Sequence, residues 1–202
     1  STTPYRQIRA HFEADTIIVY QAYNDTIATA ALASQRLHAS SLFKPGRMTW
    51  IKPSFSWMMY RSGYTYKDAN QSRILALRIT HASFLALLRR AVLSHGNQFQ
   101  DTGGLPAGSV RVQWDPERSP SLAKLPYRSV QIGIPGALMR EFVEDMVVEI
   151  RDETERARAL KRWLDENGWR SSQGEEKVVE GLMPEERVYE APHDVMALLK
   201  MD

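Results

Sequence analysis

The chain has 202 residues, 43% of them apolar and 25% charged, and a net charge of +2. This length and composition are those of one ordinary globular domain, and they exclude a fibrous chain, a wholly disordered chain and a strongly basic nucleic-acid packaging protein. The longest apolar run is far shorter than the roughly 20 residues of a membrane-spanning helix, no apolar signal segment opens the chain, and there is no cysteine. We therefore expect a cytoplasmic protein without membrane contacts or disulfides.

The first half of the chain shows strand patterns that alternate with helix patterns. Runs rich in β-branched and aromatic residues predict strands over residues 16–23, 47–53 and 73–80. Each run is followed or closed by a residue that commonly begins a helix, namely Asn24, Pro53 and Thr80. The second of these helices is expected to end at Gly63, and the third repeats its apolar residues at helical spacing up to Gly96.

The second half adds further strands and helices. Alternating apolar residues predict strands over 109–115 and 128–134; a polar loop, 97–108, precedes the first, and a proline-bearing loop joins the two. Helices are predicted over 135–147 and 152–168. Residues 147–152 either end the first of these helices or form a short strand.

This order of elements has no regular strand–helix–strand rhythm, which favours an α+β fold over a doubly wound parallel sheet. We predict a single compact α+β domain over residues 1–168, in which helices flank a mixed, mostly antiparallel β-sheet that is either continuous or split. Residues 169–202 are predicted to form a C-terminal tail with a short docking helix.

An aromatic and basic stretch, MTWIKPSFSWMMYRSG (48–63), is the most informative motif. On the predicted helix, Trp57 and Arg61 are four residues apart and share one side, next to a strand end that presents Trp50 and Lys52. Indole rings beside cations can stack on a base and hold a phosphate. The alternative is that the tryptophans fill the core while the cations reach out to water.

Two further groups of charged residues lie next to strands. Arg6 and Arg9 precede the first strand, where they either bind phosphate or carboxylate groups or belong to a solvated arm. Asp115, Glu117 and Arg118 stand where a strand meets a proline turn. Carboxylates beside an arginine can supply a general base and its orienting partner, although Asp-Pro is also a common way to begin a turn.

Other signatures of catalysis or metal binding are missing from the sequence. The five histidines show no metal-site spacing, so no metal cofactor is expected. The glycine pair at 103–104 does not continue into a phosphate-binding loop, and there is no Gly-x-Ser-x-Gly elbow. These absences disfavour P-loop ATPases, Rossmann enzymes and serine hydrolases.

Three segments together resemble a known family: YRQIRAHFEADTIIVYQAY, RMTWIKPSFSWMMYRSG, and VRVQWDPER followed by LPYRSVQIGI. They are similar to an uncharacterised bacterial and fungal family, domain of unknown function 4291, over roughly residues 4–150. The resemblance implies no established activity.

At the level of fold, the order of elements is also similar to ADP-ribosyltransferase domains, which use NAD. Those domains carry functional groups on the first strand, in the middle of the domain and on a late strand. The similarity implies Tyr20 or Gln21 at the first position, Trp50 or Tyr60 at the second and Gln131 at the third. The chain departs from that pattern because the first strand lacks a histidine and Gln131 is not an acid, so Asp115 or Glu117 would have to substitute.

Two functional hypotheses follow. The first is a nucleotide-dependent, ADP-ribosyltransferase-like transferase that uses NAD and acts on a small molecule or on nucleic acid. Its expected catalytic residues are Asp115, Glu117, Gln131 and Tyr20. Its expected cofactor-binding residues are Arg6, Arg9, Gln21, Trp50, Lys52, Trp57, Arg61 and Arg118. The second hypothesis is a non-catalytic module that binds RNA or single-stranded DNA with the same cations and rings. A plainer alternative is a protein-interaction domain that uses the helix at 152–168.

Overall fold

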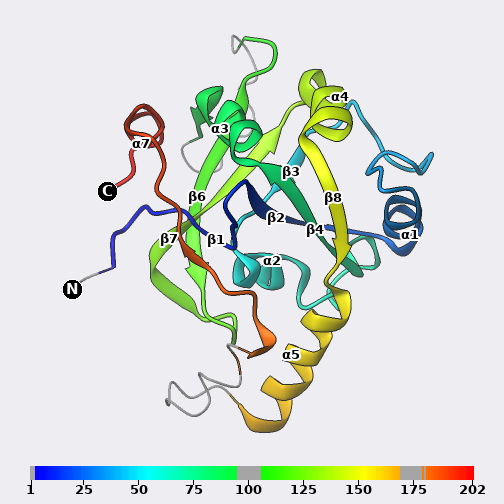
Figure 1. Ribbon diagram of the computed structural model, residues 1–202. Coiled ribbons are helices and arrows are strands. Elements are labelled where there is room, and N and C mark those ends of the chain that lie inside the picture. The colour runs from blue at the N-terminus through cyan, green and yellow to red at the C-terminus, as the bar shows by residue number, and fades with distance from the viewer. Residues whose placement is uncertain (1–2, 95–105, 169–178, 180) are drawn as a thin grey trace.

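Two β-sheets that meet at one strand pair organise the molecule (Figure 1). The computed structural model describes residues 3–94, 106–168, 179 and 181–202. An antiparallel sheet has the order β2 (Thr16–Tyr23), β4 (Arg73–Thr80) and β8 (Val147–Asp152). A second sheet has the order β3 (Thr49–Ile51), β7 (Lys124–Ile134), β6 (Val110–Arg118) and β5 (Ala91–Leu93).

The two sheets are joined by main-chain hydrogen bonds between Tyr20 of β2 and Lys52, directly after β3. The Tyr20 N–H donates to the Lys52 carbonyl at 2.7 Å, and the Lys52 N–H donates to the Tyr20 carbonyl at 3.2 Å. In the second sheet the β5–β6 pair is parallel, and the other described pairs are antiparallel. The predicted α+β fold with a mixed, mostly antiparallel sheet is thus confirmed, and the sheet is split.

Helices cover both sheets. The longer ones are α1 (Asp25–Ser34), α2 (Phe55–Ser62), α3 (His81–Arg89), α5 (Thr154–Asn167) and α7 (His193–Leu199). Single turns are the 3-10 helices η1 (Ala69–Gln71) and η2 (Gly136–Leu138), α4 (Met139–Glu141) and the π-helix η3 (Phe142–Met146). In the described ranges no helix is both long and apolar enough to cross a lipid bilayer.

Strand β2 is buried on both of its faces, as its apolar pattern indicates. Ile17 and Val19 pack into a large core shared by the two sheets, α1 and α3. Ile18 and Tyr20 point the other way, into a second core closed by α2 and α5. Because β2 also pairs with Lys52, any side chain at the junction of the sheets is held on a rigid frame.

Several predicted boundaries are wrong for physical reasons. Residues 91–93, expected in a helix, form β5, since α3 ends at Arg89. The proline-bearing loop is mostly strand: β6 and β7 continue into it, and their register shifts between Pro116 and Arg118. A bulge of this kind tolerates a proline, which has no N–H to give to the ladder. Residues 147–152 form β8, so the helix predicted before them ends at a π-turn.

The end of the chain returns to its beginning. Strand β9 (Arg187–Val188) pairs with β1 (Arg9–Ala10), and Asp202 exchanges hydrogen bonds with the main chain of Arg6. The two ends lie on the same side of the molecule in Figure 1. Helix α7 buries Val195 and Leu199 in the large core, so the end of the predicted tail forms a helix that packs against the rest of the chain. The predicted loop at 97–108, with the glycine pair 103–104, and the first part of the tail lie mainly outside the described residues.

Candidate functional site

A cleft of about 740 Å³ opens where the two sheets meet. Its walls come from the end of β2, the loop before β3, β3 itself, α2 and the turn η1. Four cations line it, Lys44, Arg47, Lys52 and Arg61. Aromatic rings also line it, from Tyr23, Phe43, Trp50 and Trp57. The volume lies in the range of roughly 300–1,000 Å³ that small-molecule sites occupy.

Helix α2 directs two of these side chains into the cleft. Ser54 caps the helix, since its Oγ accepts the Trp57 N–H at 3.1 Å, and Gly63 ends it in the left-handed conformation at φ 57°. The helix therefore begins at Phe55, two residues after Pro53, which the sequence pattern predicts in its first turn. Its turn places Trp57 and Arg61 on the cleft side. Phe55 and the two methionines that follow Trp57 pack into the second core and so fix the orientation of the helix.

Lys52 forms part of the cleft floor. Only 6% of its surface is exposed, and its Nζ donates one long hydrogen bond, 3.4 Å, to the Trp50 carbonyl. The same ammonium lies 5.2 Å from the centroid of the Trp57 ring. Burial, reinforced by the Arg61 charge and opposed by Asp115, lowers the pKa of Lys52 to about 7.

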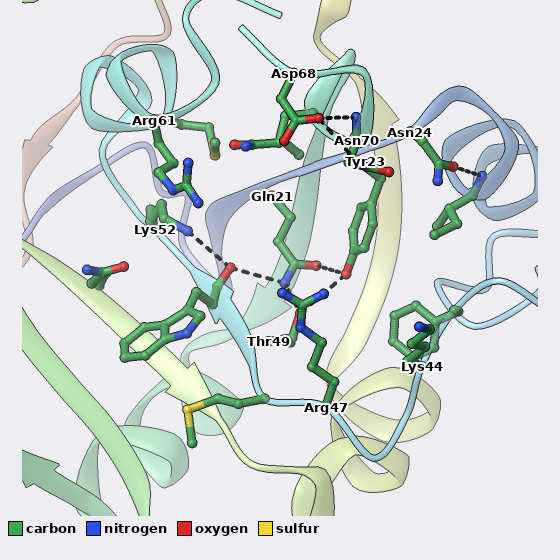
Figure 2. A pocket seen from close by; sticks show the side chains of 18 of the residues that line it. Gln21, Tyr23, Asn24, Lys44, Arg47, Thr49, Lys52, Arg61, Asp68 and Asn70 are labelled. Atoms are coloured by element: carbon green, nitrogen blue, oxygen red, sulfur yellow. Dashed lines mark hydrogen bonds between the residues drawn. The ribbon is translucent and has the colours of Figure 1, made fainter. Parts of the chain in front are cut away.

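A network of polar side chains fixes the floor beside Lys52. Gln21 Nε2 donates to Thr49 Oγ1 and to the Trp50 carbonyl, each at 3.1 Å, while the Tyr23 hydroxyl donates to Gln21 Oε1 at 3.0 Å. Figure 2 shows the hydrogen bonds of this network as dashed lines between the labelled side chains of Gln21, Tyr23 and Thr49. The Gln21 amide is thereby held in one orientation at the point where β2 meets β3.

Behind the floor lies a half-buried carboxylate held by two amides. Asp115 accepts hydrogen bonds from Gln131 Nε2 at 2.5 Å and from Gln113 Nε2 at 2.9 Å. Burial raises the pKa of Asp115, although these amides and the Lys52 charge partly oppose the shift. Gln131 lines the cleft, so the Gln131 side chain connects Asp115 to the cleft by one hydrogen bond.

The rim of the cleft carries an excess of positive charge among the described residues. Lys44, Arg47 and Arg61 are exposed, and none of them forms an ion pair with a carboxylate of the described residues. Asp68 is the one carboxylate among the lining residues, and it accepts from the Asn70 N–H at 2.9 Å. That hydrogen bond helps to lower the pKa of Asp68. Figure 2 shows Arg47 and Arg61 reaching toward the same space from opposite walls. The cleft is thus suited to an anion.

A second cluster of charges surrounds the start of α2. Glu117 Oε1 accepts from Ser54 Oγ at 2.8 Å, and Glu186 Oε1 accepts from the Phe55 N–H at 2.6 Å. Burial raises the pKa of Glu117, and it raises that of Glu186 strongly. Both carboxylates thus support the helix that carries Trp57 and Arg61, and the nearby positive charge of Arg9 partly compensates them.

The predicted site residues divide between these places. Gln21, Trp50, Lys52, Trp57, Arg61 and Gln131 line the cleft, and Asp115 stands one hydrogen bond behind it. Arg9 and Glu117 lie in the second cluster, and Arg118 stacks 3.6 Å above the Tyr60 ring, outside the cleft. Tyr20 is 1% exposed in the second core, and Arg6 lies at the chain ends.

The sequence interpretation missed the rim residues Lys44 and Arg47. Both belong to KPGR, an irregular loop before β3 that has no periodicity to show which way a side chain points. A basic Pro-Gly loop directly before an aromatic strand is the signal that was available. Among the described residues, no cluster of three histidine or acidic side chains is arranged to hold a metal ion.

Comparisons with known proteins give one result at the level of family. The profile described as "Domain of unknown function (DUF4291)" matches residues 7–189, which include all the residues that line the cleft. No curated protein matches the chain.

Proposed function

The chain belongs to the family described as domain of unknown function DUF4291, and from its cleft we propose that it is a nucleotide-dependent transferase of the ADP-ribosyltransferase type that uses NAD. The observation that carries this proposal is the meeting of Gln21, Trp50 and Gln131 in one cleft. These residues come from an early strand, a middle strand and a late strand. They are also the positions that the fold-level similarity implies.

The cleft residues fit a dinucleotide. The exposed guanidinium groups of Arg47 and Arg61 would bind its diphosphate from two sides, because a guanidinium can donate two parallel hydrogen bonds to phosphate oxygens. The indole of Trp50 and the edge of Trp57 would contact its rings. When bound, NAD supplies a glycosidic bond to nicotinamide that can be exchanged for a bond to an acceptor.

The amides of Gln21 and Gln131, with the carboxylate of Asp115 behind them, would orient the groups next to the glycosidic bond. Gln21 and Gln131 are each fixed by hydrogen bonds, so their orientation in the cleft costs little on binding. Asp115 holds the Gln131 amide with its oxygen free to accept a hydrogen bond from the ribose or from the acceptor. A half-buried acid whose pKa is raised by partial burial, placed beside a cleft, supports an enzyme over a passive binding surface.

The first experiment is to titrate the protein with NAD and with ADP-ribose by calorimetry, and then to incubate it with NAD labelled in the adenylate and with RNA, DNA and protein acceptors. We expect binding and transfer of label.

Arg61→Met should weaken NAD binding about 10- to 100-fold, since a hydrogen bond to a charged group contributes about 1.5–3 kcal/mol. Arg162→Met is the matched control, because Arg162 is also an exposed helical arginine but lies on α5, away from the cleft.

The unpaired cations of the rim also fit a non-catalytic module that binds RNA or single-stranded DNA. In that case oligonucleotides would bind, NAD would not, and affinity would fall steeply as salt is raised, because phosphate contacts release counterions. NAD binding that is lost in Arg61→Met and retained in Arg162→Met would exclude this alternative. The absence of NAD binding would overturn the proposed transferase.

A further inference from the structure

We propose that Lys52 is a nucleophilic amine, whose Nζ forms a reversible imine with an aldehyde or ketone that carries a phosphate or another strongly anionic group. The observation behind this proposal is a buried lysine on the floor of a cleft, below three rim cations and without an ion-pair partner among the carboxylates that the structure describes. The proposal goes beyond the transferase function and does not depend on NAD.

The main chain fixes the position of Lys52. Its N–H and carbonyl are both bonded to Tyr20, at 3.2 and 2.7 Å, and Pro53 follows directly. The side chain then runs into the cleft, where Figure 2 shows its amine near the guanidinium of Arg61. The main-chain pairing fixes the point from which the side chain starts, and its burial, with 6% of its surface exposed, confines Nζ to the floor of the cleft.

The surroundings of Nζ do not hold it as an ordinary ammonium group. An ammonium has three N–H donors, whereas the one hydrogen bond that Nζ makes within the described part of the chain, to the Trp50 carbonyl, is long at 3.4 Å. No described carboxylate forms an ion pair with Lys52. The Trp57 ring, 5.2 Å from Nζ, is the other group that favours the cation. With one long hydrogen bond and one ring contact, the ammonium is held less well here than in water, and the free amine becomes accessible.

The charged groups that face Lys52 come from three directions. Arg61 of α2 repels a proton on Nζ, and Arg47 lines the same cleft from the loop before β3. Asp115 of β6 attracts the proton, but its oxygens are already bonded to Gln113 and Gln131. Burial is the largest influence, and the resulting pKa of about 7 leaves much of the amine neutral at physiological pH. Desolvation beside another cation is a known way to activate a lysine for attack on a carbonyl.

The rim defines the class of carbonyl compound. Lys44, Arg47 and Arg61 can hold an anionic group above the floor, so a phosphate-bearing aldehyde is bound with its carbonyl free to approach Nζ. The Nζ lone pair attacks the carbonyl carbon, the C=O π pair moves to oxygen, and a proton from Nζ reaches that oxygen to give a carbinolamine. Loss of one water then gives the imine. The step consumes one amine and one carbonyl and needs no oxidant or reductant.

Pyridoxal 5′-phosphate is a suitable probe, since it is an aldehyde that carries a phosphate, and pyridoxal is its uncharged comparison. The full chain is incubated with each at low concentration, the imine is fixed by borohydride, and the modified peptide is identified by mass spectrometry. We expect modification at Lys52, at least 10-fold faster with the phosphate. The rate should rise with pH around a midpoint near 7. Lys52→Arg should abolish it, and Lys67→Arg, at an exposed lysine, should not.

Arg61→Met provides a second test that does not remove the amine. It should shrink the preference for the phosphate-bearing aldehyde and move the midpoint of the pH profile upward, because one repelling charge is gone. Modification spread over the exposed lysines and unchanged in Lys52→Arg would overturn the proposal, as would a midpoint near that of an ordinary lysine. Since no step uses NAD, failure here is distinguishable from failure of the transferase proposal.

Discussion

At the scale of single residues, the position of Lys52 makes stability depend on pH. The pKa of this amine is about 7 in the folded protein and about 10.5 in an exposed lysine, so between these values the unfolded chain binds more protons. The free energy of unfolding therefore rises with pH in this window. The stability that the neutral amine contributes at high pH is lost as the pH falls through about 7.

Lys52→Met keeps an unbranched side chain and removes the amine. We predict that the free energy of unfolding of the wild type, relative to this variant, rises by about 1.4 kcal/mol per pH unit above pH 7. Urea unfolding at pH 6, 7, 8 and 9 measures this slope. Lys67→Met, at an exposed position, should give the same difference at every pH. A constant difference for both variants would mean that Lys52 titrates like a surface lysine.

The aromatic and basic stretch shows how far spacing leads at this scale. The four-residue spacing of Trp57 and Arg61 predicted a shared side, and the structure confirms that both line one cleft. Phe55 and Met59, on other faces of the same helix, lie in the second core. It could not show that Lys52 would be buried, because that depends on Tyr20, which comes from a strand 32 positions earlier in the sequence.

At the scale of elements, the pairing of β3 with β7 positions the indole of Trp50. Trp50 stands opposite Gly133, and a Cβ at Gly133 would lie 3.0 Å from two atoms of the indole and from Met48 Sδ. The ring therefore lies directly against the bare backbone of β7. Any side chain at this position has to displace it.

Gly133→Ala should accordingly lower the free energy of unfolding by about 1–3 kcal/mol, the usual cost of overpacking, and weaken ligand binding through the displaced ring. Denaturant unfolding and NAD or pyridoxal phosphate titration measure the two effects. Gly181→Ala is the control, since a Cβ there meets no atom within 4 Å and its effect should stay within about 0.5 kcal/mol. Equal effects of the two substitutions would contradict the stacking of Trp50 on β7.

Elements with a long, consistent pattern were predictable, and short or interrupted ones were not. The strands at 16–23 and 73–80 match β2 and β4, because both alternate or are apolar throughout and end at a helix cap. Strand β5 has three residues and pairs with β6 only after the chain folds, so its local sequence gives no sign of it. The prediction ended β6 before Pro116, because a proline is compatible with a strand only at a bulge or an edge; the strand in fact continues through such a bulge.

At the scale of the whole molecule, the chain ends are packed together by contacts that no local pattern contains. Strands β1 and β9 have two residues each and lie at opposite ends of the sequence. Trp114 Nε1 of β6 donates to the Leu199 carbonyl of α7 at 2.9 Å, which ties the last helix to the second sheet. Glu186, just before β9, binds the start of α2, so the C-terminal segment also supports a wall of the cleft.

Two adjacent leucines of α7 test whether this segment belongs to the domain or is a loosely attached tail. Leu199 is 0% exposed in the large core, whereas Leu198 is 41% exposed. Leu199→Ala should lower the free energy of unfolding by about 2–5 kcal/mol, because a buried leucine loses its contacts and leaves a cavity. Leu198→Ala should change it by less than about 0.5 kcal/mol. Denaturant unfolding of the full chain measures both. If Leu199→Ala were as mild as its neighbour, α7 would contribute little to stability, and the segment would be a tail that the fold does not require.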